Sequence, residues 1–314
     1  MHTDCATVRD PAVSNAQLAF RRRSMRRRGF ISLFPAGAAS FVAAGSFGQP
    51  KALSTTLLGI PLEVHGEWRP SSARDVAAVV FRMRQVSLAG VRLLSDRQPS
   101  GLRIENHSSG NPAIWLHNDG STTASIIVNV GPRDWSKLAY QFGHELGHVL
   151  ANSWDAHSKP RNPCQWLEEV LVEAFSLRGL DKLADSWEQR PIFPNDAPFA
   201  NAIRQYRRNA IMKYEEIASN QMQAFQADTW FRQHRSSLEA DGGLSGAAEA
   251  SVTTMLHELE TDMRGIEDMG ALNRWHGRSS VPIEQYVRLW QKSCNEIGVA
   301  GRLPERLVGL LGLR

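Results

Sequence analysis

His144, Glu145 and His148 are the residues of this chain whose types and spacing point most directly to chemistry. They lie in the segment Phe142–Leu150, which reads Phe-Gly-His-Glu-Leu-Gly-His-Val-Leu. Residues four apart lie on one face of a helix, so the two imidazoles could bind one metal ion. The carboxylate beside them could act as a general base toward a water at that metal. The pattern therefore predicts a metal site suited to hydrolysis.

A catalytic zinc site typically has three protein ligands and one open position, so the motif needs a further ligand. The segment 165–177 carries Glu168, Glu169 and Glu173 and is otherwise apolar over most of a helical circumference. A helix of that kind is normally buried, and a buried carboxylate needs a partner or a metal. At about 100° per residue, Glu169 and Glu173 share one narrow polar strip, whereas Glu168 lies on another side. This geometry favours Glu169 over Glu168 as the third ligand.

With both segments in view, the chain resembles the gluzincin metallopeptidases, the thermolysin-like and aminopeptidase-like branch of the zincins. The resemblance covers about Asp134–Leu177. It implies Glu169 as the third zinc ligand, with 20 residues between it and His148, and Glu173 as the acidic residue that orients a histidine ligand. It also implies one catalytic zinc ion and a peptide or protein substrate. Glu145 would take a proton from the attacking water.

Other interpretations of the same residues stay open. Glu168 could be the ligand, although it stands where the family often has Asn, and His157 could be an atypical third ligand. A metzincin-like site fits poorly, because that pattern needs Gly and His where this chain has Ala151 and Trp154. The two motif histidines could also be ordinary residues without a metal, and Glu169 could belong to a solvated helix face.

Substrate contacts are less sharply predicted than the metal site. The family usually places a Tyr or His where it stabilises the oxyanion. The candidates in this chain, among which the sequence does not choose, are His157, Tyr206, Tyr214 and His234. An extended substrate could pair with an edge of the sheet around Ser125–Val130 or Ala113–His117.

The alternative from another class is an exported zinc-binding scaffold or binding protein that keeps the fold and lacks hydrolysis. Glu145 argues against it, because metal binding does not require this residue. A nucleic-acid binder is suggested by the pI of about 9.1. However, residues 1–45 hold seven arginines against two aspartates, and the remainder holds 29 basic and 30 acidic residues. The basic charge belongs to the N-terminal segment, so we expect no nucleic-acid partner.

That N-terminal segment, residues 1–45, has the pattern of an export signal. The run Arg27-Arg28-Gly29-Phe30-Ile31 resembles a twin-arginine signal, and an Ala-rich apolar stretch follows it. The stretch is too short and too rich in small residues for a typical membrane span. We therefore expect a periplasmic or secreted protein with no stable span after cleavage. An uncleaved N-terminal membrane anchor is the alternative.

The order of the strands and helices predicted around these residues indicates an α+β, zincin-like fold. In this fold a small twisted sheet packs on the motif helix, and a helical lobe follows. We expect a sheet-containing subdomain over residues 46–153 and a helical subdomain, carrying the third ligand, over 154–314. A strand with a break is predicted at Leu53–Val64, which carries Gly59 and Pro61. Further strands are predicted at Val91–Leu94, Leu102–Asn106, Ala113–His117 and Thr122–Val130. A helix is predicted over Ala73–Leu88 with Ser71 or Ser72 as its cap, and another from Asp134 or Ser136 to about Asn152. A third runs from Asn162-Pro163 to about Arg178 with Gly179 as its stop, and the chain after about residue 196 is predicted to be helical throughout.

Two glycines of the motif helix and two cysteines later in the chain raise questions about packing and covalent bonds. Gly143 and Gly147 lie four apart inside the motif helix, where glycine is normally avoided, and this predicts the close approach of a neighbouring backbone.

Cys164 and Cys294 are the two cysteines after the N-terminal segment. Their spacing leaves open whether they pair as a disulfide or stay buried free thiols.

The export signal gives the first testable prediction. Exchanging both Arg27 and Arg28 for lysine keeps the charge but removes the arginine pair of the signal. We expect the double variant to accumulate as precursor inside the cell, whereas the wild-type chain is exported and begins near residues 45–53. Cell fractionation and N-terminal sequencing measure this. Unchanged processing of the double variant would reject the twin-arginine route, though not export by another route.

Overall fold

The computed structural model describes residues 56–92, 95–116, 120–155, 157, 161–221 and 227–313. These residues belong to one compact unit that starts at Lys51. The export signal predicted over residues 1–45 lies outside the described residues. The subdomain division between residues 153 and 154 stays a prediction. Of the helices in the described ranges, none has both the length and the apolar character needed to cross a membrane.

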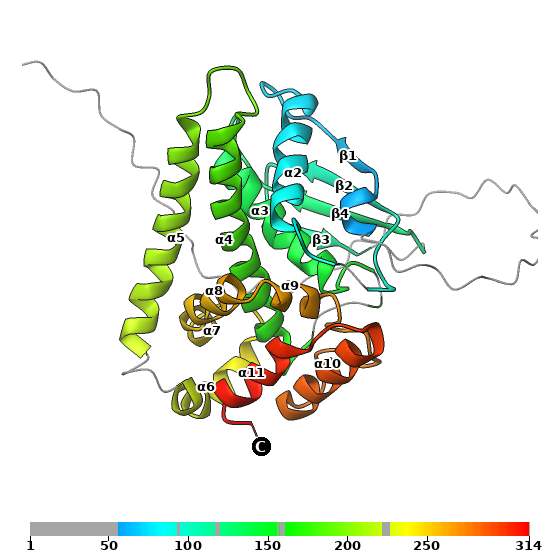
Figure 1. The fold of residues 1–314 in the computed structure, drawn as a ribbon, viewed down its shortest axis with the longest axis vertical. Coiled ribbons are helices and arrows are strands. Elements are labelled where there is room, and N and C mark those ends of the chain that lie inside the picture. Colours follow the sequence, from blue (N-terminus) through cyan, green and yellow to red (C-terminus); the bar gives the residue numbers. More distant parts are fainter. Residues whose placement is uncertain are drawn as a thin grey trace, which may run out of the picture. The chain divides into compact units, whose positions relative to one another are not determined.

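A mixed sheet of four strands forms the first part of the fold (Figure 1). Its strands are β1 (Leu62–His65), β2 (Gly101–Asn106), β3 (Ala113–Trp115) and β4 (Thr123–Val128), in the order β1-β2-β4-β3. β1, β2 and β4 are parallel neighbours, and β3 pairs antiparallel to β4. β4 is therefore paired on both sides. The expectation of a free edge at Ser125–Val130 is wrong, and the edge on that side of the sheet is β3.

The motif helix α3 (Trp135–Leu150) packs on this sheet and on α2 (Ala73–Ser87). The predicted cap of α2 is confirmed, because the Ser72 hydroxyl accepts a hydrogen bond of 3.0 Å from the Asp75 amide. α3 follows Asp134, but the Asp134 side chain makes no capping hydrogen bond. The apolar stripe of α3 that faces the core is fully or almost fully buried and consists of Leu138, Phe142, Leu146, Val149 and Leu150.

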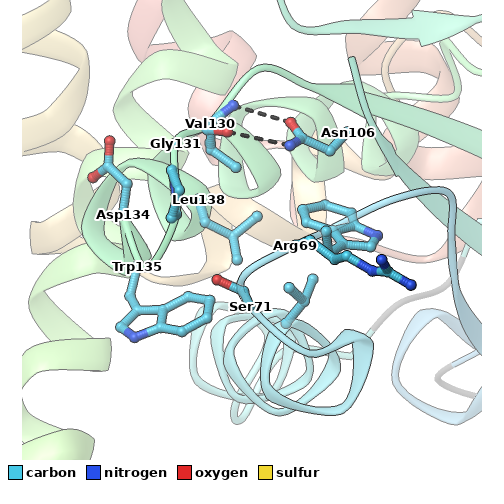
Figure 2. A pocket seen from close by; sticks show the side chains of 11 residues that line it. Arg69, Ser71, Asn106, Val130, Gly131, Asp134, Trp135 and Leu138 are labelled. Atoms are coloured by element: carbon cyan, nitrogen blue, oxygen red, sulfur yellow. Dashed lines mark hydrogen bonds between the residues drawn. The ribbon is translucent and has the colours of Figure 1, made fainter. Parts of the chain in front are cut away.

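The Asn106 side chain binds the turn between β4 and α3 at Val130. Asn106 donates to the Val130 carbonyl at 3.2 Å and accepts from the Val130 amide at 3.0 Å (Figure 2). Beside this pair lies a cavity of about 40 Å³, bordered by Trp68 and Trp135. That volume has room for only a few water molecules. The cavity includes none of the predicted metal ligands, so it belongs to the scaffold.

Helix α4 (Gln165–Gln189) is the long central helix and is buried on nearly every side. The prediction that it ends at Arg178 with Gly179 as a stop is wrong. A Cβ added at Gly179 would lie 2.4 Å from the Ser87 hydroxyl oxygen and 2.5 Å from the Met83 methyl carbon. This glycine therefore permits close packing against α2 in the middle of a helix. α4 also begins at Gln165, slightly later than the predicted start at Asn162-Pro163.

The rest of the described chain is helical, as predicted for the part after residue 196. The remaining helices are α5 (Phe199–Gln221), α6 (Ala227–Asp241), α7 (Ala247–Ala250), α8 (Val252–Thr261), α9 (Arg264–Met269), α10 (Ile283–Ile297) and α11 (Arg302–Leu310). A short helix α1 (Thr56–Gly59) precedes β1 where a strand with a break was expected, and Val91 and Arg92 are not in a strand. A small mixed sheet, the motif helix packed on it and a helical lobe confirm the α+β prediction (Figure 1).

Both cysteines of the described chain are buried free thiols. The Cys164 thiol donates to the Val281 carbonyl at 3.1 Å, and burial raises the pKa of Cys164 to about 12. Of the two possibilities left open by the sequence, the structure has the free thiols.

The two glycines of α3 lie where α4 passes closest. A Cβ added at Gly147 would lie 2.8 Å from the Val172 Cβ and 3.1 Å from the Val172 Cα. A Cβ at Gly143 would lie 2.9 Å from the Ser176 hydroxyl oxygen and 3.4 Å from the Ser176 Cα. The predicted close approach of a neighbouring backbone is confirmed, and the neighbour is the helix that carries the three glutamates.

Gly147→Ala tests this packing. Alanine gains about 1 kcal/mol of helix propensity over glycine, but overpacking a core costs about 1–3 kcal/mol. The contact is with the base of Val172, which cannot swing away, so we expect a net loss of stability in chemical denaturation. Gly309→Ala in α11 is the matched control, because nothing lies within 4 Å of its added Cβ. That variant should be neutral or slightly stabilised. Equal behaviour of the two variants would contradict the close packing.

Candidate metal centre

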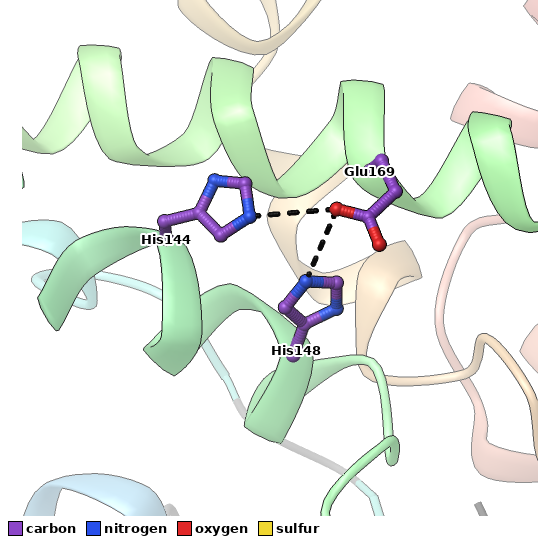
Figure 3. Close-up of side chains that lie close together, drawn as sticks. All are labelled: His144, His148 and Glu169. Atoms are coloured by element: carbon purple, nitrogen blue, oxygen red, sulfur yellow. Dashed lines mark ion pairs between the residues drawn. The ribbon is translucent and has the colours of Figure 1, made fainter. Parts of the chain in front are cut away.

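Helices α3 and α4 bring three predicted ligands together (Figure 3). Glu169 Oε2 lies 3.5 Å from His144 Nε2 and 3.5 Å from His148 Nε2. One ligand atom from each of the three residues lies within 4.8 Å of the other two. The group can therefore hold one metal ion.

The spacing suits a small tetrahedral cation. Bonds of about 2.0–2.2 Å in a tetrahedral zinc site place ligand atoms about 3.3 Å apart. The observed separations of 3.5 Å between each imidazole nitrogen and the carboxylate oxygen need little adjustment. Glu169 keeps its other oxygen engaged, because Gln165 donates to Oε1 at 3.2 Å. The three ligand atoms thus converge on one point from two helices.

The other ring nitrogen of each histidine is held by a separate carboxylate. His144 Nδ1 lies 2.9 Å from Glu173 Oε2, and His148 Nδ1 lies 2.7 Å from Glu168 Oε1. A carboxylate only accepts, so each Nδ1 donates a proton to its carboxylate. Each Nε2 is then the nitrogen that would bind a metal, once its own proton has left. Glu173 therefore contacts one histidine of the motif and Glu168 contacts the other.

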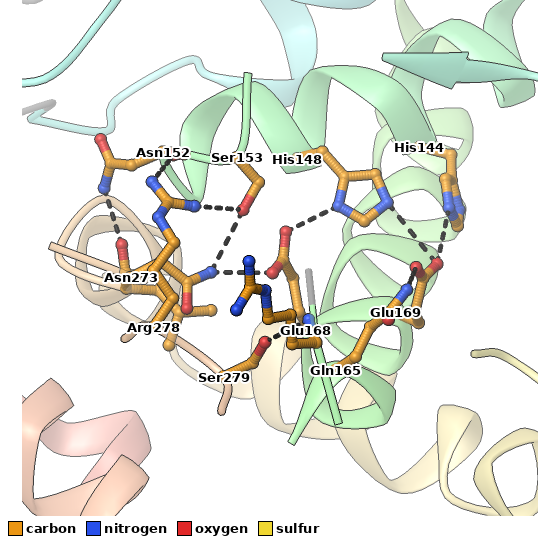
Figure 4. Close-up of polar contacts among 12 residues, drawn as sticks. His144, His148, Asn152, Ser153, Gln165, Glu168, Glu169, Asn273, Arg278 and Ser279 are labelled. Atoms are coloured by element: carbon orange, nitrogen blue, oxygen red, sulfur yellow. Dashed lines mark hydrogen bonds and ion pairs between the residues drawn. The ribbon is translucent and has the colours of Figure 1, made fainter. Parts of the chain in front are cut away.

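Glu168 lies on the far side of His148 from Glu169 (Figure 4). It is not one of the three converging residues. Adjacent positions on α4 point about 100° apart, so Glu169 reaches the two Nε2 atoms while Glu168 reaches the back of one ring. From the sequence, Glu168 was considered only as an alternative ligand, and this contact with His148 was not predicted.

The carboxylates have further partners that the sequence did not reveal. Glu173 Oε1 accepts from the Tyr140 hydroxyl at 2.7 Å and from the Tyr214 hydroxyl at 3.0 Å. Glu168 Oε2 accepts from Asn273 Nδ2 at 2.7 Å. These donors come from α3, from α5 and from the segment after α9. No spacing rule connects residues so far apart in the chain.

The electrostatics of the group favour a cation. Burial alone would lower the pKa of His144, but the carboxylates of Glu169 and Glu173 outweigh burial and raise that pKa to about 10. Burial of His148 is likewise outweighed by Glu169 and Glu168, and its pKa is raised. Burial would raise the pKa of Glu169, yet the two imidazoles hold it well below its usual range. The field that stabilises a proton between these groups would also stabilise a metal cation.

Glu145 is buried on α3, with 3% of its surface exposed. It lies near the ligands, because the charge of its carboxylate contributes to the raised pKa of His144. The structure therefore keeps Glu145 beside the group, as its place in the motif predicts.

The four oxyanion candidates lie in different places. Tyr214 donates to Glu173, so its hydroxyl stands behind His144, away from the Nε2 side. The Tyr206 ring packs against Tyr140, with 5.5 Å between ring centroids. His157 is exposed and is not part of the ligand group, and the His234 ring packs beside Trp230 on α6. None of these contacts assigns an oxyanion donor.

The chain matches no family model, no curated protein and no solved structure.

Ligand variants test the centre. Glu169→Ala removes a converging oxygen and should abolish stoichiometric zinc binding. Glu168→Ala and Glu173→Ala remove only the partner of an imidazole, so each should weaken zinc binding by about 10- to 100-fold. His157→Ala should leave the metal content intact. Zinc stoichiometry and chelator competition on the purified variants measure this. Retention of zinc in Glu169→Ala together with its loss in His157→Ala would indicate a three-histidine site.

Proposed function

We propose that this protein is an exported zinc metallopeptidase of the gluzincin type, which hydrolyses peptide bonds in a peptide or protein substrate. The observation that carries the proposal is the convergence of His144, His148 and Glu169 on one point, with Glu145 beside them. A set of two imidazoles and one carboxylate is the ligand set of catalytic zinc sites that keep one position open. Glu145 is not one of the three converging residues, so its presence beside them favours a hydrolytic site over a purely structural one.

The ligands would hold the zinc ion through His144 Nε2, His148 Nε2 and Glu169 Oε2. When bound there, zinc acts as a Lewis acid that makes water more acidic and polarises a carbonyl oxygen. The protein's part is to fix the three ligand atoms. Glu173 and Glu168 do this by holding the Nδ1 atoms, which prevents either ring from turning.

Glu145 is the general base of the proposed reaction. Its carboxylate accepts a proton from the attacking water, and the water oxygen forms a bond to the carbonyl carbon of the substrate. The bond between that carbon and the amide nitrogen then breaks, and the proton passes from Glu145 to the departing amine. Burial of Glu145 keeps bulk water from competing for this proton.

The proposed substrate is an extended peptide that pairs with β3. This strand is at the edge of the sheet, and within the described ranges no strand pairs with its outer side. Trp115 on β3 is 49% exposed, which gives the edge an apolar contact surface. Main-chain hydrogen bonds along an edge strand bind peptides without regard to most side chains. Export to the periplasm or beyond, inferred from residues 1–45, is part of the proposal.

Glu145→Gln tests the role of the base. The glutamine keeps the size of the side chain but does not accept the proton, so digestion of a peptide library should slow by about a hundredfold or more. Zinc content should stay at that of the wild-type chain. Glu216→Gln, an exposed residue of α5, is the matched control and should change neither quantity.

Two outcomes would count against this function. Loss of zinc in Glu145→Gln as complete as in His144→Ala would make Glu145 structural. A wild-type chain that binds zinc and cleaves no member of the library would be the zinc-binding scaffold instead.

A further inference from the structure

The carboxylate of Glu168 is almost fully buried, with 1% of the residue exposed, and its two oxygens serve two different groups. Oε1 faces His148 Nδ1 at 2.7 Å, and Oε2 accepts from Asn273 Nδ2 at 2.7 Å. Rotation of this carboxylate about its last bond would break both contacts. The partner of Oε2 therefore decides how Oε1 meets the imidazole.

The orientation of Asn273 is itself fixed. The Tyr286 hydroxyl on α10 donates to Asn273 Oδ1 at 2.9 Å, and Nδ2 also donates to the Ser153 hydroxyl at 3.2 Å. Because the carboxylate of Glu168 only accepts, the amide must present its NH₂ group to it. Asn273 is buried, with 1% exposed, so no bulk water replaces these contacts.

The backbone at residue 273 suits asparagine as well. Its φ is 58°, in the left-handed region that asparagine tolerates better than most residues. The surrounding segment 270–278 holds the end of α3. Asn152 Nδ2 donates to the Gly270 carbonyl at 2.9 Å and to the Leu272 carbonyl at 2.8 Å, and Arg278 donates to the Asn152 carbonyl. Figure 4 shows this polar network beside His148.

We propose that Asn273 is a positioning residue of the metal centre, which holds the Glu168 carboxylate in the orientation that fixes the His148 ring. The segment 270–278 of the helical lobe is then part of the metal centre, although it supplies no ligand. Zinc affinity depends on this segment through Glu168. The inference rests on the metal site proposed above.

Two substitutions at residue 273 test the inference on the full chain. Asn273→Gly deletes the amide and keeps a residue that adopts positive φ freely. Asn273→Asp keeps the shape but places a second carboxylate against Glu168. Both should weaken zinc binding by about 10-fold or more in chelator competition. Both should also change the visible absorption of the Co²⁺-loaded chain, because that spectrum follows ligand geometry.

Matched controls separate positioning from backbone strain and from loss of stability. Asn195 is exposed and has a φ of 61°, so Asn195→Gly and Asn195→Asp repeat the backbone change away from the site. Asp268 is buried and accepts from the Gly301 amide at 2.8 Å and the Leu303 amide at 2.9 Å. Asp268→Asn should therefore lower the melting temperature of the protein and leave its zinc affinity unchanged.

A double-variant cycle shows whether Asn273 acts through Glu168. In a Glu168→Ala background, Asn273→Gly should have no further effect on zinc affinity, because there is no carboxylate left to hold. Should Glu168→Ala fail to fold, Glu168→Gln supplies a background of equal volume. In that background the effect of Asn273→Gly should be smaller than in the wild-type chain.

Several outcomes would overturn the inference, and the measurements tell them apart. Zinc affinity that is unchanged in both Asn273 variants overturns it and leaves the metal site standing. An equal effect of Asn273→Gly in both backgrounds, or an equal loss of affinity in Asp268→Asn, makes Asn273 a structural residue only. A wild-type chain that binds no zinc removes the proposed site and this inference together.

Discussion

The structure depends on a set of buried carboxylates on one helix that face the imidazoles of another. Taking a carboxylate out of water is costly unless other groups replace its hydration. Here each carboxylate has specific partners: Glu173 has two tyrosine hydroxyls and a ring nitrogen, and Glu168 has a ring nitrogen and an amide. These contacts recruit groups from α3, α5 and the segment after α9. The buried carboxylates on α4 therefore bring residues that are far apart in the sequence into contact around the two histidines.

A consequence of this arrangement is that the ligands are oriented before any metal binds. Each imidazole is fixed at its Nδ1, so the Nε2 atoms face Glu169 without help from an ion. Ligands that need little rearrangement bind with a smaller entropic cost. The carboxylates that raise the pKa of both imidazoles in the metal-free site would attract a metal cation in the same way.

The sequence predicted the parts of the site that follow from helical periodicity. His144 and His148 share a face because they lie four apart, and Glu169 and Glu173 share a strip for the same reason. The contacts of Asn273, Tyr140 and Tyr214 with the carboxylates were not predicted, because such contacts are set by how helices pack and not by spacing along one helix. Tyr214 was considered only as an oxyanion candidate. Gly179 was misjudged as a helix end for a related reason: glycine in a helix either stops it or permits close packing, and only the presence of α2 decides which. The prediction of a sheet edge at Ser125–Val130 was wrong because strand order is a property of the whole sheet and cannot be read from one strand.

The two glycines of α3 touch no metal and take no part in the proposed chemistry, yet they set the distance between the helix of the histidines and the helix of the glutamates. A side chain at either position would push α4 outward and carry Glu169 with it. Selection for the proposed metal site would therefore also restrict positions 143 and 147 to small residues. Relatives that keep both histidines but have lost these glycines would need a compensating smaller residue at position 172 or 176.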